Sequence, residues 1–177
     1  MYRQLAKHRL VYSYVIALLT IVFAHRPPIY WGLILIAAGM AVRFWAAGHI
    51  QKNDEVSKTG PYAFTRNPLY LGTFLGALGA CVLGHEFILM AVMVITFALF
   101  YGSTIASEEE YLSSHYGDDY TEYKKHVPVF LPRLTPYKTD SQSTYSWARA
   151  LKNREHKYSG TTILIPILII LVAYLRH

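Results

Sequence analysis

The sequence predicts an all-α integral membrane protein, a helical bundle of about five transmembrane helices. Of its 177 residues, 53% are hydrophobic and only 16% are charged, whereas a soluble domain carries about 25% charged residues. The mean hydropathy is positive, at +0.22. Five apolar windows approach the roughly 20 residues that a helix needs to cross the hydrocarbon core. A chain of this length is expected to form one domain, here spanning 1–177.

The windows alternate with polar segments along the chain. They are residues 10–25, 30–48, 69–84, 87–106 and 161–175. The last contains Pro166, which a membrane helix tolerates where neighbouring helices satisfy the freed carbonyl. The third and fourth are joined by a turn of a few residues, so they are expected to form an antiparallel hairpin. Gly72 and Gly76 in the third have the small-xxx-small spacing of closely packed membrane helices.

The basic residues indicate the orientation. Fourteen of the 17 Lys and Arg residues fall in the N-terminus, the 49–68 loop and the segment 107–160, and positively charged loops stay in the cytosol. We therefore expect an inner (cytoplasmic) membrane protein with a cytosolic N-terminus, a cytosolic segment 107–160 and an external C-terminus. The net charge of +6 is assigned to contact with anionic membrane lipids rather than with nucleic acid.

The first segment expected to carry chemistry runs from Gly60 to Gly72. Asn67-Pro68 predicts a turn followed by a helix, because proline is well suited to the first helical position. Arg66 and Asn67 would then lie at a helix N-terminus, where unpaired N–H groups attract a carboxylate or phosphate. The alternative is an arginine that reaches the lipid headgroups beside an ordinary helix cap.

The second segment begins with Glu108-Glu109-Glu110, at the inner end of the fourth window. Acidic residues near a helix C-terminus oppose the helix dipole, so this cluster could hold a cation or a partner arginine. The alternative is a solvated turn, which we favour for Glu110. Arg43, a charge inside the second window, is a functional candidate by default. Its alternative is a structural pair with one of these three glutamates.

These segments resemble a known superfamily. Arg66, Pro68 and Tyr70 are similar to the Arg-His-Pro-x-Tyr motif of isoprenylcysteine carboxyl methyltransferases and phospholipid N-methyltransferases. The second motif of the same superfamily resembles Glu108-Glu109-x-x-Leu112 followed by Gly117, Tyr120, Tyr123, Val127-Pro128 and Pro132. Further similarity is found at Arg43-x-Trp45, Gln51-Lys52, Asn53 and Asn153-Arg154-Glu155. The resemblance covers about two-thirds of the chain.

The resemblance implies a membrane methyltransferase that uses S-adenosylmethionine and no metal. Arg66, Asn67 and Tyr70 would hold the cofactor's methionine carboxylate, and Glu108 or Glu109 its ammonium group or ribose hydroxyls. The full implied set is Tyr62, Arg66, Asn67, Tyr70, Gly72, Glu108, Glu109, Tyr120, Val127 and Pro128, with Tyr62, Tyr120 and Val127-Pro128 beside the adenine. Asn67 departs from the family's histidine; it can donate a hydrogen bond but cannot carry charge.

The positions of the remaining ionisable residues predict a lipid-like methyl acceptor. Arg43, Arg154 and Glu155 are expected to act at the reaction site and to meet a headgroup that enters sideways from the bilayer. Arg43 fits a carboxylate or phosphate, and Glu155 fits an ammonium group or accepts its proton. The acceptor would therefore be of the isoprenylcysteine carboxylate type or the phosphatidylethanolamine type.

Other classes of function remain to be compared. A di-iron membrane hydroxylase is excluded in practice, because no two of the eight histidines have the three- or four-residue spacing of a histidine box. An NADPH-dependent membrane reductase with a similar pocket and a non-catalytic membrane protein stay open as alternatives. Binding of S-adenosylmethionine or of NADPH would distinguish them.

Overall fold

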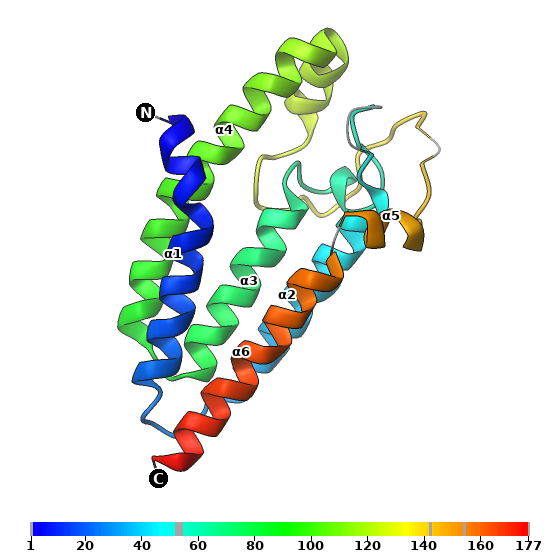
Figure 1. Ribbon diagram of the computed structural model, residues 1–177. Helices are drawn as coiled ribbons and strands as arrows, with labels where there is room; N and C mark the ends of the chain where they lie inside the picture. Colours follow the sequence, from blue (N-terminus) through cyan, green and yellow to red (C-terminus); the bar gives the residue numbers. More distant parts are fainter. Residues whose placement is uncertain (1, 52–54, 142, 154, 177) are drawn as a thin grey trace.

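The computed structural model describes residues 2–51, 55–141, 143–153 and 155–176. Within these ranges it contains helices and no strand. Five long helices run antiparallel to their neighbours in sequence, and the two termini lie at opposite ends of the bundle (Figure 1). They are α1 (Tyr2–Phe23), α2 (Trp31–His49), α3 (Pro68–Leu83), α4 (Phe87–His126) and α6 (Glu155–Leu175), joined by the short η1 (Gly60–Ala63) and α5 (Trp147–Lys152).

The all-α fold with membrane-spanning helices is confirmed, and the number of five crossings stays a prediction. Among the described residues, three helices are long and apolar enough to cross a membrane: α2, α4 and the Tyr158–Leu175 part of α6. The other two predicted windows correspond to shorter apolar helices, Val11–Phe23 and Pro68–Leu83. Pro166 lies inside α6, as expected. The apolar windows thus give the positions of the bundle helices, although α1, α4 and α6 each extend beyond them into polar sequence.

Close packing of glycines holds α2 against α3. A Cβ atom on Gly39 would lie 2.5 Å from the carbonyl oxygen of Gly72, and one on Gly32 would lie 2.4 Å from that of Gly79. The predicted Gly72 is part of this contact. Gly76 takes part through its backbone, because a Cβ atom on Gly39 would lie 2.8 Å from the Gly76 nitrogen. A Cβ atom on Gly76 itself would point away from α2, 3.6 Å from the Tyr158 hydroxyl. The partner glycines on α2 were not predicted.

A glycine reverses the chain within α4. Gly117 has φ 54° and ψ −127° and divides the helix in two. This conformation is in practice open only to glycine, which lacks a Cβ atom. The first part of α4 rises beyond the other helices, and the second part turns back toward the start of α3 (Figure 1). The reversal brings Tyr120, Tyr123 and Val127 into a buried cluster with Val56.

Candidate ligand site at one end of the bundle

A cavity of about 560 Å³ lies at the end of the bundle where α2 ends and α3 and α6 begin. Cavities of roughly 300–1,000 Å³ are typical of small-molecule and cofactor sites. The walls come from these helix ends, from residues 55–57, from η1 and from both parts of α4. The site therefore depends on the reversal at Gly117.

A buried ion pair forms one wall. Arg43 of α2 donates from Nε to Glu155 Oε1 at 2.7 Å and from Nη2 to Oε2 at 3.0 Å. Its Nη1 donates to Thr73 Oγ1 at 2.6 Å and to the Leu69 carbonyl at 3.1 Å. The guanidinium also lies 3.5 Å from the centre of the Tyr158 ring. Glu155 is only 3% exposed, so the pair fixes the start of α6 against α2 and α3.

This geometry identifies the ion-pair partner of Arg43. The structural alternative named Glu108, Glu109 or Glu110 as its partner, and that choice is wrong, because the partner is Glu155. Glu110 is exposed to solvent, as favoured. Thr73 and Tyr158, which complete the surroundings of Arg43, were missed by sequence reasoning. Tyr158 could have been found, since it follows Glu155 by three residues and such residues share one face of a helix.

Arg66 lies at a helix N-terminus, as predicted, and Asn67 is the N-cap residue of α3. Arg66 donates from Nε to Glu109 Oε1 at 2.8 Å, and its Nη2 lies 2.8 Å from the same oxygen. Its Nη1 donates to the carbonyls of Lys124 and Val127, at 2.7 and 2.9 Å. Arg66 therefore ties the returning part of α4 to the start of α3 while lining the cavity.

The polar neighbours of Arg66 are also engaged. The Asn67 side-chain amide donates to the Val129 carbonyl at 2.9 Å. Tyr70 donates to Glu108 Oε1 at 2.6 Å. Both glutamates of the predicted motif thus face the cavity from α4, and each is oriented by a residue of the Arg66–Tyr70 segment.

Tyr62 provides the one buried polar atom of the cavity wall that lacks a partner among the described residues. The Tyr62 residue is 7% exposed, and its hydroxyl makes no hydrogen bond within the described part of the chain. Its backbone carbonyl accepts a 2.6 Å hydrogen bond from the Tyr123 hydroxyl, which fixes the segment. Burial raises the pKa of Tyr62 above its ordinary value, so the phenol keeps its proton. A buried donor without an acceptor is costly, and a ligand oxygen or nitrogen in the cavity would satisfy it.

The structure brings most of the predicted site residues together. Nine of them line the cavity: Arg43, Tyr62, Arg66, Asn67, Tyr70, Glu108, Glu109, Tyr120 and Glu155. Three lie behind its wall. Gly72 packs against α2, Val127 is 1% exposed in the tyrosine cluster, and the Pro128 carbonyl accepts from the Arg66 backbone N–H at 2.9 Å. Arg154 lies outside the described residues, as do Lys52 and Asn53.

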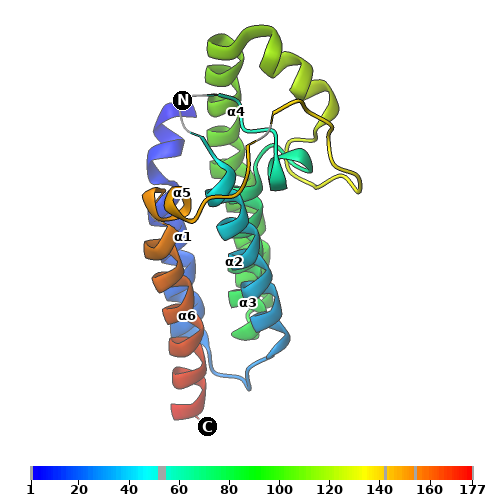
Figure 2. The ribbon, with the colours of Figure 1, turned by 90° about the vertical axis from the view of Figure 1, so that its right-hand side faces the viewer.

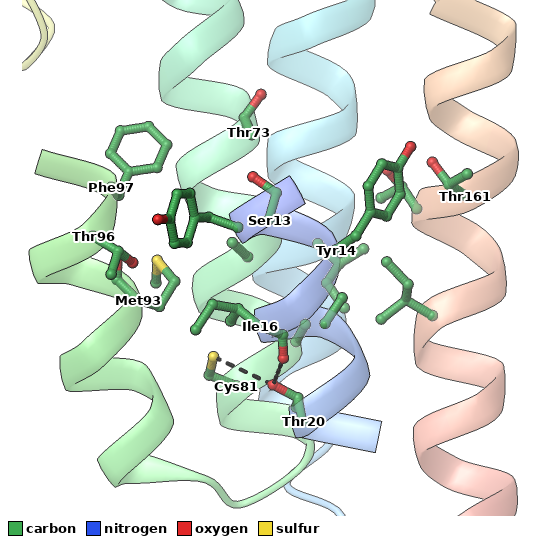
Figure 3. Close-up of a pocket in the computed structure, with 18 of the residues that line it drawn as sticks. Ser13, Tyr14, Ile16, Thr20, Thr73, Cys81, Met93, Thr96, Phe97 and Thr161 are labelled. Atoms are coloured by element: carbon green, nitrogen blue, oxygen red, sulfur yellow. Dashed lines mark hydrogen bonds between the residues drawn. The ribbon is translucent and has the colours of Figure 1, made fainter. Parts of the chain in front are cut away.

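A second, smaller cavity of about 150 Å³ lies deeper in the bundle, among α1, α3, α4 and α6 (Figure 3). Its wall is mostly apolar, with residues such as Ile16, Met93 and Phe97, and its floor carries Thr20, whose hydroxyl lies 3.9 Å from Cys81 Sγ (Figure 3). An apolar cavity of this size holds a group about as large as benzene.

The two cavities meet at shared walls. Thr73, Tyr101 and Tyr158 line both of them. Tyr101 is 7% exposed, and its hydroxyl lies 2.9 Å from Ser13 Oγ of α1. Thr73 and Tyr158 are also the residues that contact Arg43. A charged pair therefore lies at the boundary between a polar and an apolar space.

The fold defines an integral membrane protein whose helical bundle has, at one end, a cavity of the size of small-molecule sites. The sequence profile of the phospholipid methyltransferase family matches residues 12–119, more than half of the chain. The chain belongs to this family. None of the solved structures compared with the chain matches it.

Several curated proteins are similar in sequence to part of the chain. The nickel-cobalt-cadmium resistance protein NccN of Alcaligenes xylosoxydans xylosoxydans is 34% identical over 116 residues, which are 64% of this chain and 53% of that protein. Protein-S-isoprenylcysteine O-methyltransferase of Schizosaccharomyces pombe is 33% identical over 100 residues, 56% of this chain and 42% of that protein. The human enzyme of the same name is 30% identical over 121 residues, 62% and 43%. The chain spans about half the length of the curated relatives it matches.

Proposed function

We propose that the protein is an S-adenosylmethionine-dependent membrane methyltransferase acting on a lipid-like acceptor. Membership of the phospholipid methyltransferase family supports methyl transfer. The relatives named isoprenylcysteine O-methyltransferases support an acceptor with an apolar chain. The observation that carries the acceptor class is the meeting of the polar and apolar cavities at Thr73, Tyr101 and Tyr158.

The residues of the larger cavity suit the cofactor chemically. Bound S-adenosylmethionine supplies an electrophilic methyl group next to a positively charged sulfur. The carboxylates of Glu108 and Glu109 can accept from an ammonium group or from ribose hydroxyls. The Tyr62 hydroxyl, which has no partner within the described part of the chain, can donate to a ligand atom. Arg66 and Asn67 contribute positive charge and an amide donor beside the N-terminus of α3.

The assignment of Arg66 to a cofactor carboxylate competes with an existing contact. Glu109 already occupies its Nε and Nη2, so direct contact with a cofactor would require sharing or replacing that carboxylate. Arg66 would also act indirectly, by holding Glu109 and the Val127 carbonyl in the cavity wall. Both roles predict loss of cofactor binding when Arg66 is removed.

We assign the acceptor headgroup to the Arg43–Glu155 pair, together with Arg154. The bonds of Arg43 account for four of its five N–H groups among the described residues, which leaves a donor for an acceptor carboxylate or phosphate. Both oxygens of Glu155 accept from Arg43, so taking a proton from an amine would compete with the pair. This favours a carboxylate acceptor, which needs no base, over an aminophospholipid.

Methyl transfer of this kind depends on positioning and on exclusion of water more than on acid–base groups. The Arg43 guanidinium is held on three sides by Glu155, Thr73 and Tyr158, so it can orient a headgroup with little rearrangement. The apolar cavity beyond it would take the first part of the acceptor's chain. On the sequence argument, this end of the bundle and the segment 107–160 face the cytosol.

Ligand binding to the purified protein tests the proposal. Titration with S-adenosylmethionine and with NADPH, each followed calorimetrically in lipid nanodiscs, should give binding of the first alone. Transfer of labelled methyl groups should then be faster to a farnesylated cysteine analogue than to phosphatidylethanolamine vesicles. Binding of NADPH alone would support a reductase, and binding of neither would support a non-catalytic protein.

A role in resistance to divalent metal ions is a second candidate, because NccN and a cobalt-zinc-cadmium resistance protein are 34% and 33% identical to the chain. This role is compatible with methyl transfer. Growth of a strain lacking the gene on nickel, cobalt and cadmium salts tests it, and complementation by an inactive variant would separate the two functions.

A further inference from the structure

The loop after α4 exposes apolar side chains to an unusual degree. We define it as residues 128–136, which include Pro128, Pro132 and Pro136. Leu134 is 98% exposed, Leu131 is 74% exposed and Val129 is 41% exposed. Single exposed apolar residues are ordinary, but three within six positions form a patch of the kind found at interaction sites.

The loop is held firmly at the beginning of α3. The backbone N–H of Arg133 donates to the Phe64 carbonyl at 2.9 Å, and that of Tyr137 donates to the Ala63 carbonyl at 2.8 Å. The Thr65 hydroxyl donates to the Phe130 carbonyl at 2.9 Å. The exposed leucines therefore project from a backbone that is fixed by hydrogen bonds.

One residue of the loop reaches into the apolar part of the bundle. The Phe130 ring lies 5.7 Å from that of Phe74 on α3 and 5.8 Å from that of Phe97 on α4, measured between ring centres. Phe74 lies six residues after the start of α3, about 9 Å along a helix. Leu131 thus directly follows a residue whose ring packs against apolar parts of α3 and α4.

A second exposed apolar element lies at a similar height on the opposite side of the bundle. The short helix α5 carries Trp147, 69% exposed, and Leu151, 58% exposed. Figure 2 shows α5 on the left, directly above the start of α6, and the yellow segment after α4 on the right. Tryptophan is enriched at the membrane–water boundary, so α5 marks that level independently.

The charges beside both elements complement lipid headgroups. Arg133 and Lys138 lie in or next to the loop, and Lys152 is exposed on α5. Basic residues next to exposed apolar ones are typical of segments that bind the surface of anionic membranes.

We propose that the 128–136 loop is a membrane-surface anchor: Leu131 and Leu134 insert into the boundary between headgroups and acyl chains, and Arg133 and Lys138 face the phosphates. The other side of the loop supplies the carbonyls of Pro128 and Val129 to Arg66 and Asn67. The same backbone therefore links the bilayer surface to the wall of the ligand cavity. The proposal does not rest on the proposed enzymatic function.

Fluorescence from a labelled cysteine tests the anchor. In a Cys81→Ser background, which removes the chain's single cysteine, Leu134→Cys is labelled with a nitrobenzoxadiazole probe and placed in nanodiscs containing anionic phosphatidylglycerol. The matched control is Asp118→Cys. Asp118 is exposed and directly follows Gly117, where α4 reverses. Both variants should keep the melting temperature of the background protein.

The expected result is a blue-shifted emission at position 134 that is quenched by spin-labelled lipids, with water-like, unquenched emission at position 118. Leu131→Cys should repeat the result at position 134. Water-like emission at both leucine positions would overturn the proposal. A blue shift without quenching by lipid would also overturn it, because it would indicate a protein partner or a second copy of the chain.

Discussion

Arg43 and Glu155, 112 residues apart in the sequence, form a two-point ion pair with Nε–Oε1 and Nη2–Oε2 distances of 2.7 and 3.0 Å. Glu155 is the first residue of α6 and Arg43 lies in the last third of α2. The pair thus joins two helices at the point where the polar cavity meets the apolar one. Its position gives it a structural role and supports the proposed role at the acceptor headgroup, and substitutions can separate the two.

Glu155→Ala should destabilise the fold strongly. Removing one member of a buried ion pair leaves the other unpaired and costs about 3–5 kcal/mol. The double variant Arg43→Met with Glu155→Leu should recover much of that stability, because well-packed apolar residues often replace a buried pair without loss. Thermal unfolding of the purified variants measures both effects.

The double variant also tests the assignment of the pair to the acceptor. It should transfer no methyl group while binding S-adenosylmethionine with nearly unchanged affinity. Loss of cofactor binding in a folded double variant would place the pair in the cofactor site instead.

Arg66→Ala should weaken S-adenosylmethionine binding at least tenfold. A hydrogen bond to a charged group contributes about 1.5–3 kcal/mol, and about 1.4 kcal/mol corresponds to one decade in Kd. Arg133→Ala is the matched control, since Arg133 also donates to a backbone carbonyl, that of His126, but does not line the cavity. An unchanged Kd in Arg66→Ala would exclude both its direct and its indirect role.

Tyr62→Phe should lower ligand affinity without lowering stability. The substitution removes only a hydroxyl that has no partner among the described residues, and a hydrogen bond to a ligand would be worth about 0.5–1.5 kcal/mol, or roughly two- to tenfold in Kd. Tyr123→Phe, in contrast, should lower the stability of the fold, because it removes the hydrogen bond to the Tyr62 carbonyl. Equal effects of the two variants on the melting temperature would contradict this account.

Gly117→Ala should misplace the returning part of α4. A side chain at φ 54° and ψ −127° costs on the order of 1–3 kcal/mol. The cost is conformational, since a Cβ atom there would meet nothing within 4 Å. Gly102→Ala on the same helix also has open space but an ordinary conformation, so its melting temperature and cofactor affinity should stay near those of the parent. Wild-type behaviour of Gly117→Ala would show that the reversal does not need glycine.

Tags on the two termini should report opposite sides of the membrane, the N-terminus in the cytosol. The basic residues predict this orientation, and the termini lie at opposite ends of the bundle (Figure 1). Protease protection of each tag in oriented vesicles measures it. A C-terminal tag on the cytosolic side would require an even number of crossings.

The sequence by itself determined the helices of the bundle and the start of α3. Apolar windows locate the membrane-facing parts of helices, and Asn67-Pro68 marks a helix N-terminus because proline needs no N–H bond there. Hydropathy did not show that α4 continues to His126, since its polar half leaves the apolar layer while remaining helical. The two motifs named most of the nine predicted residues that line the cavity, whereas the reversal at Gly117 that brings their segments together is a feature of the tertiary structure.

Tertiary structure alone decided which residues meet. The partner of Arg43 was expected among the adjacent acids of α4 and is Glu155, because the choice depends on how α2 and α6 are rotated and how far each extends. The contact of Gly39 with Gly72 and the link from Arg66 to Glu109 depend in the same way on helix positions. These rotations depend on the packing contacts along the whole length of each helix. A short sequence motif does not specify those contacts.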